Sequence, residues 1–335
     1  MSASTPTTHV KTRFLVISDT HASDPEQNVS DHDAPYRPPL PKADVLLHCG
    51  DLTMLGHLEE YERSLAMLEN IDAEVKLVIA GNHDITLDES YYARMGQRMH
   101  WERWDQDLPG KAREMWLGER AKRAGVTYLE EGTHSFALAN GGLLRVYASP
   151  YQPEFCDYAF PYSRIEDRYN PPHKCSPYVV PIAEHPVPDW SEVDVVMTHG
   201  PPMGILDAVY NGEHVGCEHL LRAARRCKPR MHCFGHIHEG WGAQKIQWAE
   251  GDELDATPQA HVTRATPIDV DQRQMKDGRA AYVDISRGGD NAVEFGRDTL
   301  MVNASIMSVT YKPSQGPWLV DMDLEKAPIS TTSNI

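Results

Sequence analysis

The sequence lacks several features that would place the protein in a specialised class. No apolar run approaches the about 20 residues that cross a membrane, and residues 1–11 contain no apolar segment of a signal peptide. The 6 cysteines are scattered without metal-knuckle spacing, which favours reduced thiols. Basic residues are few, 32 against 49 acidic ones, and they form no cluster in the sequence. We therefore expect a cytoplasmic protein with no membrane span and no nucleic-acid polymer as partner.

Five short apolar segments end directly in Asp, Asn or His, in most cases beside a glycine. Phe14–Ile17 is the first, and Asp19 and His21 follow it. The other four lead into Gly50-Asp51, Gly81-Asn82-His83-Asp84, His199-Gly200 and Gly235-His236-Ile237-His238. Such segments are typical of strands buried on both faces, and open α/β folds place their sites where these strands end. Because Asp, Asn and His bind divalent metals, the pattern predicts a metal centre.

These blocks resemble, in order and wording, the signature of the calcineurin-like metallophosphoesterases. Their flanking residues are most similar to the metallophosphoesterase-domain-containing branch of that superfamily. The resemblance covers residues 13–242. It implies an α/β fold, the calcineurin-like sandwich of two mixed β-sheets flanked by helices. Periodicity by itself indicates only that strands and helices alternate.

The resemblance also implies two divalent metal ions, for which Mn, Fe, Zn and Mg are candidates. The side chains that match the family's ligand positions are Asp19, His21, Asp51, Asn82, His199, His236 and His238. Asp19, His21 and His238 would bind one ion, whereas Asn82, His199 and His236 would bind the other. Asp51 would bridge both ions, because a carboxylate offers two oxygens.

Two further residues are predicted to be catalytic. His83 matches a family histidine that contacts the phosphate and can protonate the leaving group. Asp84 could accept a hydrogen bond from His83 and fix its tautomer, or it could cap the next helix. His48 and His232 lie inside predicted strands, so we expect them to be packed or to support ligands rather than to bind metal.

The resemblance implies a metal-dependent phosphoric ester hydrolase, in which a metal-bound hydroxide attacks a small phosphoester. The substrate would be a phosphodiester or a monoester, with a (cyclic) nucleotide as the candidate that the branch suggests. Two alternatives stay open: an iron-loaded centre that performs non-hydrolytic redox chemistry, and a metal-binding scaffold or interaction protein. The oligomeric state does not follow from the sequence.

For the domain organisation, we expect a single domain over residues 13–325 with a disordered tail at 1–12 and a C-terminal tail at 326–335. Loop insertions are predicted at about 22–42, 150–190 and 250–290. The first two should lie at the mouth of the site, because each follows a predicted sheet edge. The third is charged and poor in apolar residues, so it should contact the core little.

Periodicity predicts a helix over 58–71 and mostly helical structure over 89–124. Trp101, Trp104 and Trp116 are expected to cover the core there. Trp241 could stack on a nucleobase or cover the core.

Overall fold

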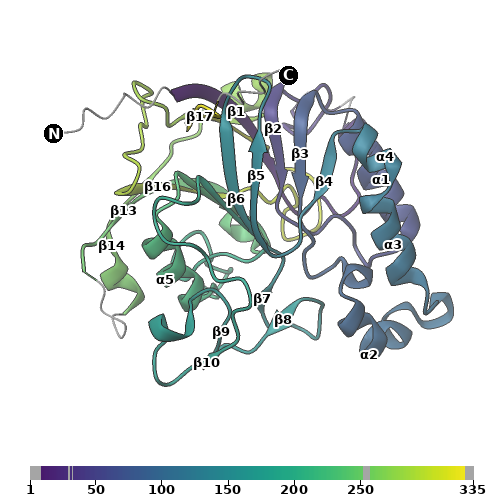
Figure 1. Ribbon diagram of the computed structural model, residues 1–335. Helices are drawn as coiled ribbons and strands as arrows, with labels where there is room; N and C mark the ends of the chain where they lie inside the picture. The colour runs from purple at the N-terminus through teal and green to yellow at the C-terminus, as the bar shows by residue number, and fades with distance from the viewer. Residues whose placement is uncertain (1–8, 29–30, 32, 252–256, 329–335) are drawn as a thin grey trace, which may run out of the picture.

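Two mixed β-sheets pack face to face, and helices cover their outer faces (Figure 1). The computed structural model describes residues 9–28, 31, 33–251 and 257–328. The six-stranded sheet has the order β15 (Ala281–Asp284), β17 (Trp318–Glu325), β1 (His9–Ile17), β2 (Ala43–His48), β3 (Ala73–Val78) and β4 (Val126–Tyr128). The seven-stranded sheet has the order β14 (Val262–Pro267), β13 (Gly242–Trp248), β16 (Asp298–Asn303), β12 (Met231–Phe234), β11 (Val195–Thr198), β6 (Leu143–Ser149) and β5 (Gly132–Ala137). The predicted sandwich is confirmed.

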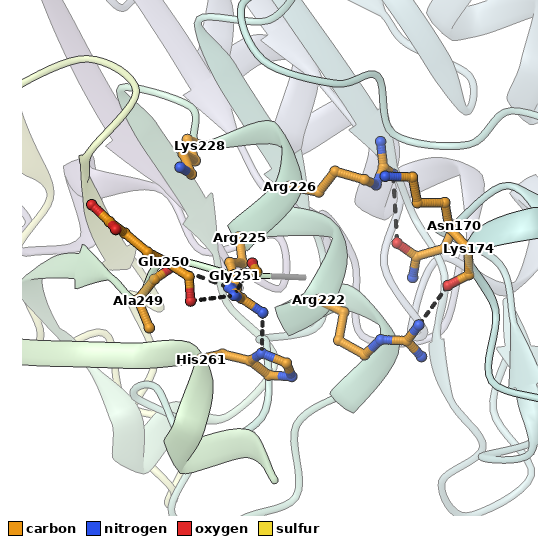
Figure 2. A pocket seen from close by; sticks show the side chains of 10 residues that line it. All are labelled: Asn170, Lys174, Arg222, Arg225, Arg226, Lys228, Ala249, Glu250, Gly251 and His261. Atoms are coloured by element: carbon orange, nitrogen blue, oxygen red, sulfur yellow. Dashed lines mark hydrogen bonds between the residues drawn. The ribbon is translucent and has the colours of Figure 1, made fainter. Parts of the chain in front are cut away.

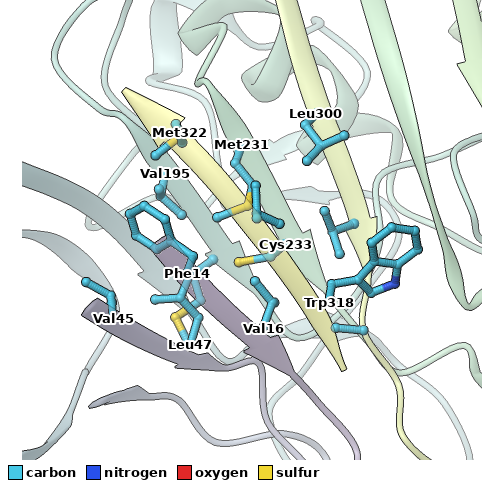
Figure 3. Packing of buried hydrophobic residues seen from close by; sticks show 14 of the residues in the cluster. Phe14, Val16, Val45, Leu47, Val195, Met231, Cys233, Leu300, Trp318 and Met322 are labelled. Carbon is cyan, nitrogen blue, oxygen red and sulfur yellow. The ribbon is translucent and has the colours of Figure 1, made fainter. Parts of the chain in front are cut away.

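The core lies between the two sheets and follows from the alternation of side chains along each strand. In β1, Phe14 and Val16 point toward the seven-stranded sheet, where they join a buried cluster with Val195 of β11 and Met231 of β12 (Figure 3). The alternate residue Leu15 points to the opposite face. Burial of each such side chain stabilises the fold by about 1.5–3 kcal/mol. Strands buried on both faces explain why the apolar segments of the sequence are nearly continuous.

Helices bury the outer faces of both sheets. The main helices are α1 (Leu58–Glu69), α2 (Glu89–His100), α3 (Leu108–Leu117), α4 (Glu119–Arg123), α5 (Glu218–Cys227) and α6 (Gln272–Gly278). Short 3₁₀ helices lie at Pro25–Asn28, Ile85–Leu87, Trp101–Arg103, Pro172–Lys174, His238–Gly240 and Pro258–His261. On α1, Tyr61, Leu65 and Leu68 pack against Leu15 and thereby cover the six-stranded sheet. On α5, residues at the same spacing pack against the seven-stranded sheet.

Within residues 150–190, two short parallel pairs form outside the main sheets. β7 (Gln152–Pro153) pairs with β8 (Pro161–Tyr162), and β9 (Glu166–Asp167) pairs with β10 (Val180–Pro181). Among the described residues, no helix is long and apolar enough to cross a membrane.

Three details differ from the sequence predictions. Trp101 and Trp104 are 77% and 43% exposed, so only Trp116, 1% exposed, covers the core. The segment 250–290 contributes β14, β15 and α6, and Val283 lies in the central cluster, because its few apolar residues gather in these elements. β1 already begins at His9, within the predicted tail, whereas residues 1–8 and 329–335 lie outside the described residues.

Candidate metal centre

The predicted ligands lie where five parallel strands end. Asp19 follows β1, Asp51 follows β2 and Asn82 follows β3 in the six-stranded sheet. His199 and His236 follow β11 and β12 in the seven-stranded sheet. Because the sheets pack face to face, these ends meet along one edge of the sandwich, as the strand-to-loop pattern predicts.

Backbone conformation turns several of these side chains inward. Asp19, His21, Asp51 and His236 have φ values of 52°, 45°, 53° and 66°, in the left-handed region that non-glycine residues rarely adopt. Each such residue costs of order 1–3 kcal/mol and persists only where the surroundings enforce it. Backbone hydrogen bonds do so here, from Asp19 N–H to the Gly50 carbonyl (3.0 Å) and from His21 N–H to the Asp51 carbonyl (3.0 Å). Such strain is typical of functional sites.

Gly81 lets two of these loops approach each other closely. A Cβ at Gly81 would lie 2.4 Å from both the backbone nitrogen and Oδ1 of Asp51, and 2.6 Å from Cε1 of His199. No flexible side chain could move to relieve the backbone contact.

We expect Gly81→Ala to displace Asp51 and lower the affinity for metal, with overpacking destabilising the fold by about 1–3 kcal/mol. Gly110→Ala is the matched control, because nothing lies within 4 Å of a Cβ at Gly110 in α3. Metal titration followed by elemental analysis checks this prediction. Unchanged affinity and stoichiometry in Gly81→Ala would show that the loops do not need this approach.

The seven predicted ligands form one continuous group. His238 Nε2 lies 3.5 Å from Asp19 Oδ1, and His21 Nε2 lies 3.7 Å from Asp51 Oδ2. On the other side of Asp51, Oδ1 lies 3.5 Å from His199 Nε2. The amide oxygen Oδ1 of Asn82 then lies 2.8 Å from His199 Nε2 and 2.7 Å from His236 Nδ1. The two carboxyl oxygens of Asp51 thus face the two predicted ligand sets.

Backbone carbonyls orient three of the histidines. Nδ1 of His21, His199 and His238 donates to the carbonyls of Thr53 (2.9 Å), Cys49 (2.9 Å) and Ser308 (3.2 Å), respectively. Nε2 of each ring therefore faces the centre and is the nitrogen that a metal ion would take in place of a proton, as in histidines that bind metals. His21 Nε2 is buried and has no hydrogen-bond partner. An unpartnered imidazole nitrogen among carboxylates fits a divalent cation.

The electrostatics of the group also fit cations. Burial raises the pKa of Asp51 to about 8, against the attraction of His199. Burial likewise opposes ionisation of Asp19, but the hydrogen bond and charge of His238 hold its pKa well below the usual range. For His238, burial is outweighed by the hydrogen bond to Asp19, which raises its pKa to about 9. Metal ions would replace the protons that this buried group otherwise needs, so we expect metal binding to release protons.

The predicted link between Asp84 and His83 is wrong. Asp84 accepts hydrogen bonds from the backbone N–H groups of Leu52, Thr53 and Gly81 at 3.1, 3.0 and 2.8 Å. Its side chain makes no helix-capping hydrogen bond either. Nδ1 of His83 donates instead to the Met54 carbonyl at 2.7 Å. Asp84 therefore ties the Asp51 and Asn82 loops together, and a backbone carbonyl fixes the His83 tautomer.

His48 and His232 support the ligand loops from inside the strands, as expected. His48 Nε2 lies 2.9 Å from the Thr20 hydroxyl, and His232 Nε2 lies 2.9 Å from the Thr198 hydroxyl. Burial lowers the pKa of each imidazole to about 3, so both are neutral. Each threonine precedes a predicted ligand directly.

A cavity of about 450 Å³ opens from the metal centre to the surface, with Asp51, Asn82 and His83 on its floor. Its walls include residues 153–155 together with Val209, Tyr210, Glu213, Val215 and Gly216. Insertion 150–190 thus lies at the mouth as predicted, whereas residues 22–42 contribute no described lining residue, contrary to the prediction. Trp241 does not line the cavity. It donates to the Gly316 carbonyl (2.9 Å) and packs on Trp318.

Two tyrosines beside the centre were missed in the sequence. The Tyr158 ring lies 4.4 Å from the His83 ring, and the Tyr311 ring lies 5.2 Å from that of His21. Both come from loops without periodicity. The positive φ of Tyr311, 55°, is a further sign of a constrained position.

With this fold and centre, the chain belongs to the calcineurin-like phosphoesterases, whose family model matches residues 12–240. Human and mouse metallophosphoesterase domain-containing protein 1 are each 29% identical to it over 317 residues, which cover 93% of this chain and 71% of each relative. This similarity confirms the predicted branch.

A probable rhamnogalacturonate lyase C of Emericella nidulans is 30% identical over 248 residues, 72% of this chain but 18% of that protein. The match to a purple acid phosphatase structure from yellow lupin covers 98% of this chain and 48% of that one, at 12% identity and a TM-score of 0.38.

Proposed function

We propose that the protein is a dinuclear metal-dependent hydrolase of small phosphoesters. The observation that carries this proposal is the position of Asp51, whose Oδ2 lies 3.7 Å from His21 Nε2 and whose Oδ1 lies 3.5 Å from His199 Nε2. A carboxylate between two sets of ligands is the arrangement that a pair of cations requires. Asp19, His21 and His238 would hold one cation, and Asn82, His199 and His236 the other.

Two bound divalent cations would supply a nucleophile at neutral pH and neutralise the phosphate oxygens. The protein's own residues hold the centre rigid, since Asp19 accepts from His236 N–H (3.1 Å) and from the Ser305 hydroxyl (2.9 Å). Preorganised ligands need no rearrangement during the reaction.

In this proposal His83 protonates the leaving oxygen. Nδ1 of His83 donates to Met54, so Nε2 is the atom that can hand a proton to a substrate in the cavity. Burial lowers the pKa of His83, which makes its protonated form a stronger acid. His83 also lies within reach of His21 and Asp51, so the metal content of a His83 variant distinguishes an acid from a ligand.

The cavity favours a compact substrate with a flat or apolar group. Tyr311 and Phe155 line the cavity, and the Phe155 ring lies 6.0 Å from the His236 ring. The Tyr158 ring lies 4.4 Å from the ring of His83, which also lines the cavity. Glu154 and Glu239 line the same cavity in a protein of net charge −17, which disfavours polyanions. A (cyclic) nucleotide, whose base could stack on these rings, is the substrate class that we propose.

We further propose that residues 13–325 act as one domain.

Metal stoichiometry tests the dinuclear proposal. We expect elemental analysis of reconstituted protein to approach two equivalents per chain, because Asp51 divides the ligands into two sets. A screen of monoesters and diesters on the same sample then identifies the substrate class. A ceiling at one equivalent in saturating Mn or Zn would contradict the dinuclear centre.

A further inference from the structure

A second cavity, of about 180 Å³, lies beside the C-terminal half of α5 and is lined largely by basic side chains (Figure 2). Arg222, Arg225 and Arg226 come from α5, and Lys228 follows the helix directly. His261 approaches from the opposite side. In a chain with 49 acidic and 32 basic residues, this gathering of cations needs an explanation.

The basic cavity is separate from the metal centre. α5 ends at Cys227, shortly before β12 begins at Met231, so the cavity lies toward the amino end of β12. The metal centre lies at the carboxyl end of the same strand. Among the described residues, the two cavities share no lining residue.

Arg225 is a buried cation held by neutral groups. It is 8% exposed, and it donates to the carbonyls of Ala249 (3.3 Å), Glu250 (3.1 Å) and Gly251 and to His261 Nδ1 (2.8 Å). Within the described part of the chain, it forms no ion pair with a carboxylate. Buried charges are costly unless an opposite charge compensates them.

The other two arginines are only partly compensated. The side chain of Arg222 is 12% exposed and that of Arg226 is 11% exposed. Arg222 lies 3.9 Å from Asp167, at the limit of an ion pair, and Arg226 pairs at 2.5 Å with Asp189, which is 60% exposed. Nε of Arg226 is buried without a partner. Glu250 is the one acidic residue among the described lining residues, against Lys228 and the three arginines, so the described lining carries an excess of cations.

The helix dipole does not account for this arrangement. Cations are favoured near a helix C-terminus, but exposed side chains suffice for that effect. Here three guanidinium groups are withdrawn from solvent around one cavity. Burial, followed by the charges of Arg225 and Arg222, lowers the pKa of His261 to about 4, so a neutral imidazole accepts the hydrogen bond from Arg225 and adds no negative charge.

We propose that this cavity is a second, metal-independent site for a small phosphate-type oxyanion, either inorganic phosphate or the phosphate group of a monoester. A guanidinium group can donate two parallel hydrogen bonds to two oxygens of one phosphate, and arginine keeps its charge when it is buried. The volume is below the about 300–1,000 Å³ typical of pockets for drug-sized ligands, so a small group fits it. The proposed site is defined by the described lining residues alone.

Calorimetric titration of the metal-loaded full chain with inorganic phosphate tests the proposal. We expect two classes of phosphate-binding site, one at the metal centre and one in the basic cavity. In Asp51→Asn, binding at the metal centre should be abolished and binding in the basic cavity should remain. Arg222→Gln should weaken that remaining class by about tenfold or more, the worth of a charge-assisted hydrogen bond. Arg222→Lys, which keeps the charge, should lose less, and neither Arg222 variant should change the hydrolysis rate without added phosphate.

Two readouts keep the test independent of folding and of the proposed activity. Phosphate should raise the unfolding temperature of Asp51→Asn but not that of Asp51→Asn combined with Arg222→Gln. Lys228→Gln, at a side chain with no described hydrogen bond, should also weaken binding without loss of fold. Repeating the titration with glycerol phosphate distinguishes inorganic phosphate from a monoester as the ligand. A site for monoesters should bind glycerol phosphate with an affinity similar to that for inorganic phosphate, whereas a site for inorganic phosphate alone should not. A single phosphate class that disappears in Asp51→Asn, or binding unchanged in Arg222→Gln and Lys228→Gln, would overturn the proposal.

Discussion

Replacing Asp51 with Asn is expected to remove metal and hydrolytic activity together. The substitution keeps the size of the side chain but removes the negative charge that faces both His21 and His199. Activity should fall by more than about 100-fold, since even hydrogen-bond partners of metal ligands are worth 10–100-fold. Elemental analysis and phosphoester hydrolysis on one sample measure both effects.

Asp72→Asn is the control for this substitution. Asp72 is another carboxylate, 66% exposed, and its one ion pair within the described part of the chain is with Lys42, so its loss should leave two ions and full activity. Retention of both ions and of normal turnover in Asp51→Asn would mean that the bridging carboxylate has been misassigned.

His83→Asn should behave differently, because His83 is proposed as the acid and not as a ligand. We expect two metal ions to remain bound and hydrolysis to slow by about 10²–10⁴-fold, the usual contribution of general acid–base catalysis. The loss should be smaller for a nitrophenyl ester, since a good leaving group needs no proton. An alkyl ester should show the full defect. The exposed His173 provides the control, as His173→Asn should change neither quantity.

Two outcomes would contradict the role of His83. Loss of metal in His83→Asn would make it a ligand, as its proximity to His21 and Asp51 permits. Full rates with both esters would show that another group donates the proton.

The metal ligands could be predicted from the sequence because the signal is local. Each ligand block follows an apolar strand directly, and the strand end fixes where the block lies. β15 was missed for the opposite reason. Its apolar residues are only Ala281, Tyr282 and Val283, and the sheet position that buries two of them is set by pairing with β17, far along the chain.

The walls of the site and the contacts of Asp84 could not be predicted. Asp84 bonds to Leu52 and Thr53, more than 30 residues earlier, and this depends on how two loops meet. Tyr158 and Tyr311 lie in loops whose paths the sequence pattern does not define. Trp101 and Trp104 were misplaced because a large apolar side chain in a helical region does not reveal which face it occupies.

The most direct test of the central proposal is the rate of phosphodiester hydrolysis measured against added metal equivalents, with dioxygen excluded. The dinuclear hydrolase predicts that activity rises to a plateau at two equivalents per chain and does not need dioxygen. A plateau at one equivalent, or turnover only when dioxygen is admitted, would contradict it.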